Sequence, residues 1–165
     1  MGIIKKILPY IFIVLLVIVV RVYIFTPITV NGESMQTALH HGDVILLNKA
    51  YKNIERFDIV VINLNDNKPL IKRIIGLPGE HIRYTNNKLY INNIVIEEEF
   101  IREDTENFSL LSLGYNYIPD DMYFVMGDNR NDSVDSRKIG LINKKDIVGK
   151  TSLILFPFNR FGTTK

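Results

Sequence analysis

The 165-residue sequence contains no cysteine. This absence excludes disulfides and thiolate metal sites, so the folded part of the chain must be held together by its hydrophobic core. The sequence also lacks an excess of charge of one sign. Its net charge of +2 at pH 7 is too small to indicate nucleic acid as a partner. With 47% hydrophobic and 23% charged residues and no repeat, the composition is typical of one compact domain with room for an insertion.

One long hydrophobic run is present near the amino terminus. Apolar residues extend from Ile7 to Phe25, and a helix over this range would be roughly 28 Å long, close to the roughly 30 Å hydrocarbon core of a bilayer. Lys5 and Lys6 precede the run, and positive flanks stay in the cytoplasm. We therefore expect a single-pass protein of the plasma membrane, with membrane lipid as a partner. Its expected parts are a cytoplasmic segment at 1–6, a transmembrane helix at 7–25 and an extracytoplasmic domain at 26–165.

Two other interpretations of this run are open. One is a cleaved secretory signal peptide, although the run is long for that purpose and Thr26, Pro27 and Ile28 offer no small-x-small cleavage site. The other is a buried core helix. A segment that is so uniformly apolar and lies at an extreme terminus favours the membrane span over both.

The rest of the chain predicts a mainly β fold with antiparallel strands, because short runs rich in β-branched residues alternate with turn residues. A hairpin is expected at 88–97, with Asn92 and Asn93 at its turn because asparagine tolerates positive φ. Polar, irregular residues follow it, so the stretch at about 81–121 is expected to be an insertion with its own hairpin. The other strands are expected at 43–48, 58–63, 70–75, 122–126 and 151–156, with a polar loop at 128–138.

Ser34 is a candidate nucleophile because it lies in a glycine-containing loop just beyond the expected membrane exit. Taken alone, such a serine is more often a cap or turn residue. A nucleophilic serine also needs a base. His40 and His41 are obvious candidates, but the sequence His-His-Gly-Asp indicates an exposed turn in which both rings are solvated.

Lys72 is the more informative basic residue. Side chains alternate between the two faces of the expected strand, so Lys72 shares a face with Leu70 and Ile74. Burial on that face would disfavour the ammonium and lower the pKa of the amine, which would let it act as a general base. The alternative is a lysine on an edge strand that protects against aggregation.

The loop from Gly127 to Arg137 is dense in polar groups. It fits a solvated loop, a calcium loop through Asp128, Asp132 and Asp135, or an internal network of ion pairs that shapes a site. Two arginines and the absence of the EF-hand spacing argue against calcium. The three histidines show no ligand spacing either, so no metal is expected.

Taken together, four blocks behind an apolar anchor resemble the type I signal peptidases of the Gram-positive, Bacillus-like kind, over almost the whole chain. The resemblance implies a serine endopeptidase, a hydrolase that removes signal peptides from exported preproteins and uses no cofactor. It also implies two antiparallel β-sheet regions, the smaller one inserted between the third and fourth blocks. The blocks are Gly32–Met35, Gly42–Lys49, Lys72–Glu80 and Gly127–Arg137, with Gly140 after them.

The resemblance also implies roles for individual residues. Ser34 would be the nucleophile and Lys72 the general base, with an oxyanion hole made by backbone N–H groups at Ser34 and Gly32. Met35 would contact substrate, and Ser133 would orient the lysine amine. Asp135 with Arg73 and Arg137 would form an ion-paired network, and Asp128 and Arg130 would be structural.

The sequence departs from the family after the serine. The family usually continues Ser-Met-x-Pro-Thr-Leu, whereas this chain has Thr37 and Ala38, so it lacks the rigid proline and one hydroxyl. A catalytically silent relative that acts as a membrane-anchored binding module is therefore the alternative. A self-cleaving repressor would need a DNA-binding domain in place of the membrane span. A penicillin-binding enzyme would need S-x-x-K, but Thr37 occupies the position of that lysine.

Overall fold

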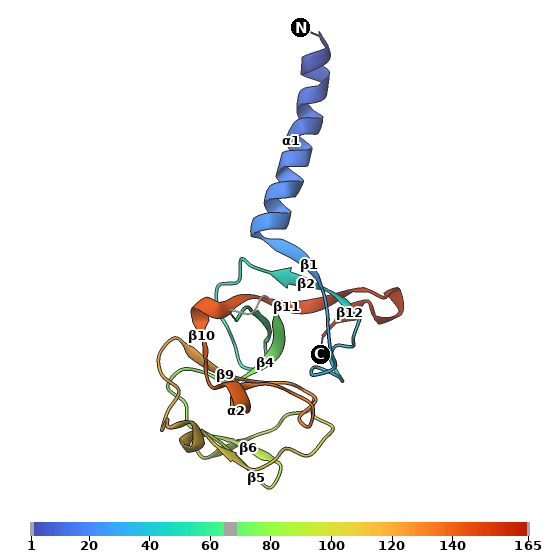
Figure 1. Ribbon diagram of the computed structural model, residues 1–165. Coiled ribbons are helices and arrows are strands. Elements are labelled where there is room, and N and C mark those ends of the chain that lie inside the picture. The colour runs from blue at the N-terminus through green and yellow to red at the C-terminus, as the bar shows by residue number, and fades with distance from the viewer. Residues whose placement is uncertain (1, 65–68, 165) are drawn as a thin grey trace.

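The amino-terminal helix stands away from the rest of the molecule (Figure 1). In the computed structural model, which describes residues 2–64 and 69–164, helix α1 extends over Gly2–Tyr23. Its stretch Lys6–Tyr23 is long and apolar enough to cross a membrane, and none of it is buried against the domain. The interpretation as a buried core helix is therefore wrong. The helix does not reach the expected end at Phe25, because that residue already begins strand β1.

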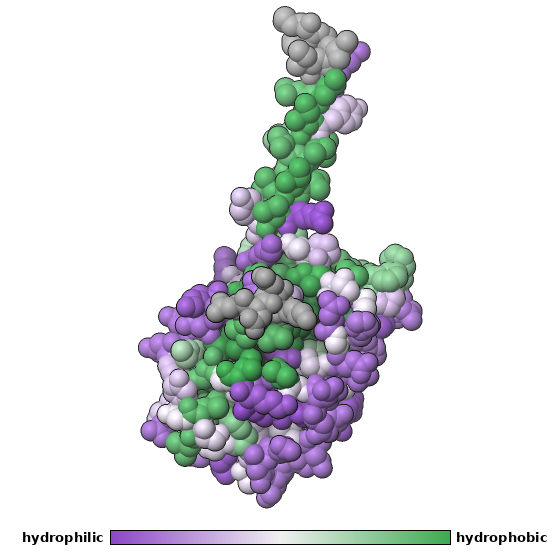
Figure 2. Space-filling model, viewed as in Figure 1, coloured by the Kyte–Doolittle hydropathy of each residue, from purple (hydrophilic) through white to green (hydrophobic). Residues whose placement is uncertain are grey.

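The surface of the molecule changes character where α1 meets the domain. Figure 2 shows that the visible side of the helix is mostly hydrophobic, whereas the visible side of the domain is hydrophilic around its periphery and has a hydrophobic area at its centre. This division is the one expected for a helix in lipid attached to a domain in water.

The larger of two antiparallel sheets contains the strand that continues α1. Its described strands lie in the order β1-β2-β11-β3-β4-β9-β10, and β12 pairs with β11. Strand β1 is therefore an edge strand, whereas β4 lies between β3 and β9. The bounds are β1 Phe25–Thr29, β2 Val44–Asn48, β3 Ile59–Ile62, β4 Leu70–Gly76, β9 Met122–Met126, β10 Ile142–Asn143, β11 Ile147–Phe156 and β12 Gly162–Thr163.

The smaller sheet lies at the end of the molecule remote from α1 (Figure 1). Its described strands lie in the order β7-β6-β5-β8, and all of them fall within the stretch that was expected to be an insertion. Short helices complete the structure: α2 at Ser136–Ile139 and 3₁₀ turns at 110–113, 144–146 and 158–160. The bounds of the strands are β5 Ile82–Thr85, β6 Lys88–Ile91, β7 Ile94–Ile96 and β8 Phe108–Ser109.

The predicted fold class, mainly β with two antiparallel sheet regions, is confirmed. The five runs rich in β-branched residues appear as β2, β3, β4, β9 and the second half of β11, and the hairpin turns at Asn92 and Asn93 with φ of 49° and 67°. A strand was also expected to begin at His81, and β5 begins at Ile82, whereas strands β1, β8, β10 and β12 were not predicted. The loop expected at 128–138 also contains the single turn of α2.

The carboxyl-terminal end of α1 is attached to the larger sheet by hydrogen bonds. Carbonyl groups at the end of a helix lack partners within the helix. Here Thr26 Oγ1 donates to Arg21 O at 2.7 Å, and Lys49 Nζ donates to Val22 O at 3.1 Å. The Lys49 N–H also donates to Ile24 O at 2.8 Å. These bonds fix the direction in which the helix leaves the sheet.

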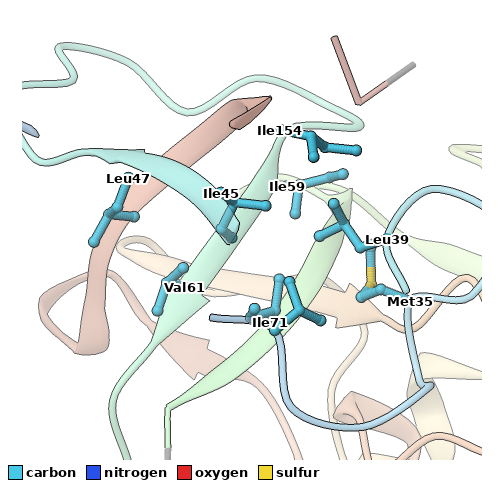
Figure 3. Close-up of a cluster of buried hydrophobic side chains, with 9 residues drawn as sticks. Met35, Leu39, Ile45, Leu47, Ile59, Val61, Ile71 and Ile154 are labelled. Atoms are coloured by element: carbon cyan, nitrogen blue, oxygen red, sulfur yellow. The ribbon is translucent and has the colours of Figure 1, made fainter. Parts of the chain in front are cut away.

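Strand β4 is the point where three hydrophobic clusters meet. Ile71 packs into the cluster shown in Figure 3, Ile75 into the cluster between the two sheets, and Ile74 into a third. Both faces of β4 are therefore covered. The alternative that Lys72 lies on an exposed edge strand is wrong. The cluster of Figure 3 consists of Val30, Met35, Leu39, Ile45, Leu47, Ile59, Val61, Ile71 and Ile154.

Candidate active site

Ser34 and Lys72 meet in the structure although 38 residues separate them in the sequence. Lys72 lies in the middle of β4, and Ser34 lies in the loop that follows β1. Val30 and Met35, on either side of the serine, are buried in the hydrophobic core, so the loop is fixed at both ends. The Lys72 ammonium nitrogen Nζ lies 2.5 Å from Ser34 Oγ.

The environment of Lys72 favours an uncharged amine. The residue is only 2% exposed, and this burial lowers the pKa of its amine from 10.5 to about 8. The carboxylates of Asp135 and Asp128 act in the opposite direction because they stabilise the ammonium, but the loss of hydration outweighs them. A lysine with such a pKa can accept a proton near neutral pH.

The loop after β9 packs directly on the backbone of Ser34. The Asn129 N–H donates to Ser34 O at 3.1 Å. At Gly127, an added Cβ would lie 2.4 Å from Ser34 O and 2.4 Å from Ser133 Oγ, closer than such atoms approach in real structures. Only glycine allows this approach, so Gly127 sets the distance between the two loops.

Asp135 fixes the loop from within. Arg137 donates to both of its carboxylate oxygens at 2.9 Å, and the Gly127 N–H donates to it at 3.1 Å. Burial of Asp135 would raise the pKa of its carboxyl group, but the hydrogen bonds from Arg137, Ser133 and Gly127 prevail and hold the pKa below its ordinary value. The carboxylate therefore stays ionised, and its ion pair with Arg137 is the pair that the sequence led us to expect.

Arg73 has a different partner from the expected one. It pairs with Asp128, through Nε at 2.8 Å and Nη2 at 2.6 Å, and not with Asp135. The reason is the register of the sheet: Arg73 lies opposite Met126, and Asp128 is two residues further along the same chain. Both members of the pair are almost fully buried.

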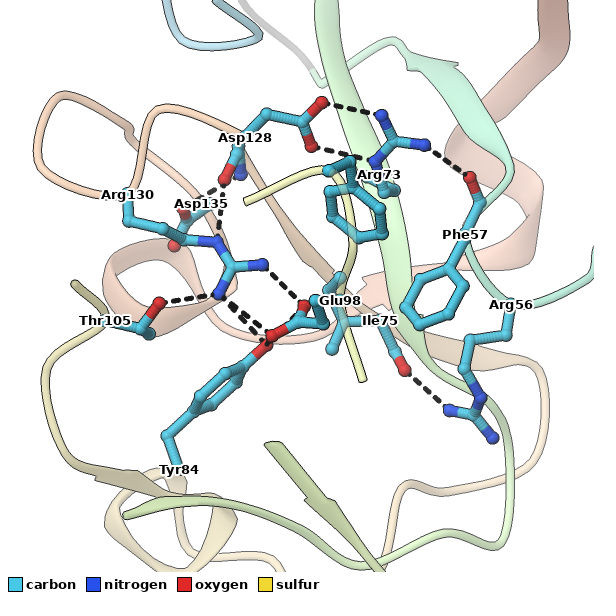
Figure 4. Close-up of polar contacts among 12 residues, drawn as sticks. Arg56, Phe57, Arg73, Ile75, Tyr84, Glu98, Thr105, Asp128, Arg130 and Asp135 are labelled. Atoms are coloured by element: carbon cyan, nitrogen blue, oxygen red, sulfur yellow. Dashed lines mark hydrogen bonds and ion pairs between the residues drawn. The ribbon is translucent and has the colours of Figure 1, made fainter. Parts of the chain in front are cut away.

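Arg130 connects the loop to the smaller sheet (Figure 4). Its guanidinium pairs with Glu98 at 2.6 Å and donates to Thr105 Oγ1 at 2.8 Å and to Tyr84 OH at 3.2 Å. Its Nε donates to Gly127 O at 3.2 Å. Sequence reasoning missed Glu98, Tyr84 and Thr105, and no local pattern indicates them because each lies at least 25 residues from Arg130.

Gly32 and Ser133 do not make the contacts that the resemblance implied for them. The Gly32 N–H donates to His41 Nδ1 at 3.2 Å and is therefore already engaged, whereas the Ser34 N–H has no acceptor among the described residues. Ser133 is buried and its hydroxyl contributes to the lowered pKa of Asp135, but it forms no hydrogen bond to the Lys72 amine in the described part of the chain.

The remaining candidates lie outside the immediate Ser34–Lys72 contact. Met35 is buried in the cluster of Figure 3 and is only 2% exposed. His40 and His41 are exposed, as expected for a solvated turn. Asp128 and Asp135 are each paired with an arginine, which supports the ion-pair interpretation of the loop. Within residues 2–64 and 69–164, no three histidine or carboxylate side chains lie together as metal ligands.

The departure from the family at Thr37 is visible in the backbone. Thr37 has φ of 108°, which proline cannot adopt because its ring fixes φ near −65°. Positive φ is also costly for a β-branched residue. The Thr37 hydroxyl donates to Phe100 O at 3.3 Å, which links this segment to the insertion.

The chain is similar to known proteins over most of its length. The family model described as signal peptidase, peptidase S26, matches residues 3–156. Signal peptidase I of Bacillus amyloliquefaciens is 40% identical over 92% of this chain and 87% of that protein. Signal peptidase I S of Bacillus subtilis strain 168 is 40% identical over 92% and 88%. The crystal structure of a signal peptidase I from Enterococcus faecalis superposes with a TM-score of 0.57 at 34% identity, covering 61% of this chain and 98% of that one.

Replacement of Lys72 by methionine is expected to stabilise the protein at pH 7, because the buried amine binds its proton less well when folded than when unfolded. A pKa that falls from 10.5 to about 8 corresponds to a cost of up to about 3 kcal/mol below pH 8. Between pH 8 and 10.5 the unfolded chain holds more protons, so the unfolding free energy of the parent rises with pH and the advantage of Lys72→Met shrinks. Urea unfolding of the full chain in detergent at several pH values measures this difference.

The matched control is Lys138→Met, which removes a lysine at an exposed position. It should leave the pH dependence of the unfolding free energy unchanged. An advantage of Lys72→Met that stays constant from pH 7 to pH 10 would contradict the lowered pKa.

Proposed function

Because the chain belongs to the signal peptidase family, peptidase S26, we propose that it is a membrane-anchored serine endopeptidase that cuts signal peptides from exported preproteins. Ser34 is the nucleophile and Lys72 the general base. The observation that carries this proposal is the 2.5 Å contact between Ser34 Oγ and the amine of Lys72, a buried residue on a strand that is covered on both faces.

The chemistry is an acyl transfer in two halves. Neutral Lys72 takes the proton of Ser34 as Oγ attacks the carbonyl carbon of the scissile peptide bond. The oxyanion that forms accepts a hydrogen bond from the Ser34 N–H, which has no other acceptor among the described residues. When the intermediate collapses, the leaving amine takes the proton from Lys72. A water molecule then attacks the acyl carbon and gives a proton to Lys72, and Lys72 returns that proton to Ser34 Oγ as the bond between Oγ and the acyl carbon breaks.

The geometry of β4 supports binding of an extended substrate. The pairing of β4 with β9 begins at Arg73, so on that side the backbone of Leu70–Lys72 has no strand partner among the described residues. A peptide can add there as a further strand and present its scissile bond to Ser34. Met35 and Ile71 are buried beneath this position, so a substrate side chain that faces them must be small.

The membrane anchor places enzyme and substrate on one surface. Helix α1 would span the bilayer, with Lys5 and Lys6 on the cytoplasmic side and the β domain outside. A signal peptide is itself inserted in the same bilayer. Confinement of both chains to one surface raises their effective concentration without any further contact.

Removal of either member of the pair is expected to abolish cleavage. Ser34→Ala, Lys72→Ala and Lys72→Arg should each lower the rate constant for cleavage of a preprotein by at least about a thousandfold, since arginine cannot deprotonate in this range. The assay uses the purified full chain in phospholipid vesicles, and circular dichroism checks that each variant folds.

Lys138→Ala and His40→Ala are the controls, because both side chains are exposed and lie outside the proposed machinery. Retention of most activity by Lys72→Ala would reject the pair and return His40 and His41 as candidate bases. A folded parent chain that binds preproteins without cutting them would favour the silent binding module.

The rate of cleavage is expected to depend on the protonation of Lys72. Because the base must be neutral, kcat/KM should rise with pH through an apparent pKa of about 8 and level off above it. Initial rates from pH 6 to pH 10 measure this profile under conditions in which chemistry limits the rate. A profile that is flat, or that rises only near the pKa of free lysine, is incompatible with the proposed base.

Gly127→Ala is expected to lower kcat at least tenfold (about 1.4 kcal/mol), because the added methyl group would push the loop away from Ser34 O and Ser133. Gly149→Ala is the matched control. Its Cβ would be equally crowded, 2.5 Å from Asn48 O, but in β11 and away from the pair. This control should lose stability and keep its kcat per folded molecule. Equal losses of kcat in both variants would contradict a positioning role for Gly127.

A further inference from the structure

The loop that carries Ser34 joins β1 to β2 and is closed at its base by backbone hydrogen bonds. The Val30 N–H donates to Asp43 O at 2.8 Å, and the Gly42 N–H donates to Val30 O at 2.9 Å. The Asp43 carboxylate lies at this base and accepts the His40 N–H at 2.8 Å. The two ends of the loop are therefore fixed, and the place of the serine depends on what holds the residues between them.

The middle of this loop is weakly supported on one side. Met35 and Leu39 are anchored in the hydrophobic core, but Thr37 and Ala38 between them line a cavity of about 830 Å³. Thr37 also has φ of 108°, which is unfavourable for a β-branched residue. Its hydroxyl donates to Phe100 O at 3.3 Å, a long bond for a hydroxyl donor. Further hydrogen bonds are needed to hold this stretch in one place.

Arg160 supplies such bonds from the carboxyl-terminal end of the chain, which lies beside the loop between β1 and β2 (Figure 1). Its Nη2 donates to Ala38 O at 3.1 Å and to Asp43 Oδ2 at 3.0 Å. Its Nε donates to both carboxylate oxygens of Asp43 at 3.2 Å. One guanidinium therefore ties the weakly supported stretch to the base of the loop, which its planar fork of donors allows.

Arg160 is itself held in a fixed turn. It ends the 3₁₀ turn Phe158–Arg160, and its N–H donates to Pro157 O at 2.9 Å. Strand β12 then returns along β11, and the Thr164 N–H donates to Ser152 O at 3.0 Å. The side chain of Arg160 is 27% exposed and that of Asp43 is 2% exposed, so water screens their attraction only in part. The chain beyond β11 thus forms a brace for the loop of residues 30–43.

We propose that Arg160 is a positioning residue that holds the loop of residues 30–43 so that Ser34 Oγ stays against the Lys72 amine. This inference rests on the proposed function. Arg160 contributes no atom to the reaction and acts through Ala38 and Asp43. A shift of about 1 Å between reacting groups costs about a hundredfold in rate. Loss of the brace would therefore slow the chemical step and leave the binding of the preprotein largely intact.

Arg160→Ala is expected to lower kcat for preprotein cleavage at least about tenfold and to change KM by less than about twofold, because the brace acts on the nucleophile. The assay uses the purified full chain in phospholipid vesicles, and circular dichroism measures the folded fraction. Ethylguanidinium added to this variant should restore a large part of the lost kcat, since it replaces the missing guanidinium between Asp43 and Ala38 O. A loss of structure alone would show no such recovery.

Arg56→Ala is the matched control. Arg56 also pairs with a carboxylate, that of Glu80, and donates to a backbone carbonyl, Ile75 O, at 2.7 Å, but its partners lie outside the loop of residues 30–43. This variant should lose stability, keep its kcat per folded molecule and gain nothing from ethylguanidinium. A parental kcat of folded Arg160→Ala, or equal losses of kcat in the two variants, would overturn the positioning role.

The double variant Asp43→Asn/Arg160→Ala covers the case in which Arg160→Ala does not fold. Arg160→Ala alone leaves the Asp43 carboxylate buried without a partner, which is strongly destabilising. In the double variant that charge is removed, and an oxygen remains to accept the His40 N–H. It should fold and show the same loss of kcat. If the parent cuts preproteins and the double variant cuts them equally fast, this inference alone is refuted. A parent that cuts none would refute the proposed function, and this inference with it.

Discussion

The structure depends on one constraint: the amine of Lys72 must lie against the Ser34 hydroxyl in a place that water does not reach. An ammonium ion in such a place is unfavourable, and this penalty lowers its pKa to about 8. The site therefore needs a strand that is covered on both faces. Strand β4 meets this need because it lies between β3 and β9 and sends Ile71, Ile74 and Ile75 into three different hydrophobic clusters.

The ion pairs around Ser34 and Lys72 fix the geometry of the site, but their carboxylates oppose the lowering of the Lys72 pKa. Buried arginine–carboxylate pairs contribute little net stability, because desolvation of both ions offsets their attraction. What the pairs provide is a fixed loop, since Arg137 with Asp135 holds Gly127, and Arg73 with Asp128 holds the next residue. Asp135 and Asp128 also favour the ammonium form of Lys72. The burial of Lys72 must therefore be nearly complete for a neutral amine to remain accessible.

Local patterns predicted the elements that local chemistry determines. The hairpin at Asn92 and Asn93 follows from the tolerance of asparagine for positive φ, and β3 and β4 follow from their β-branched residues. Strand β1 was missed because the apolar run predicted a helix as far as Phe25 and Pro27 follows it, yet proline is tolerated on an edge strand, where its missing N–H costs no ladder bond. The two-residue strands β8, β10 and β12 have no periodicity of their own.

In the candidate site, too, the residues in local sequence blocks were predicted, whereas the contacts that depend on the long-range fold were not. Resemblance to a family located Ser34, Lys72 and the polar loop, because these residues stand in continuous blocks. It assigned Arg73 to the wrong carboxylate, since the choice between Asp128 and Asp135 depends on the register of β4 against β9. It also gave no indication of Glu98, which reaches Arg130 from the inserted sheet only after the long-range fold has formed.

With the proposed membrane anchoring, the contacts that join α1 to the β domain would also give the enzyme a means of measuring its substrate. An extended chain advances about 3.3 Å per residue, so a change of that size in the height of Ser34 above the bilayer would present a different peptide bond. In the proposed arrangement, that height would be set by a continuous series of bonds. Lys49 joins α1 to β2, β2 pairs with β11, and Arg160 beyond β11 binds Asp43 and Ala38 close to Ser34. A signal peptide anchored in the same membrane has its own starting point at the bilayer surface. If the enzyme and its substrate are both anchored at that surface, as proposed, the position of the cut would be determined by distance from the bilayer as well as by the size of the side chains next to it.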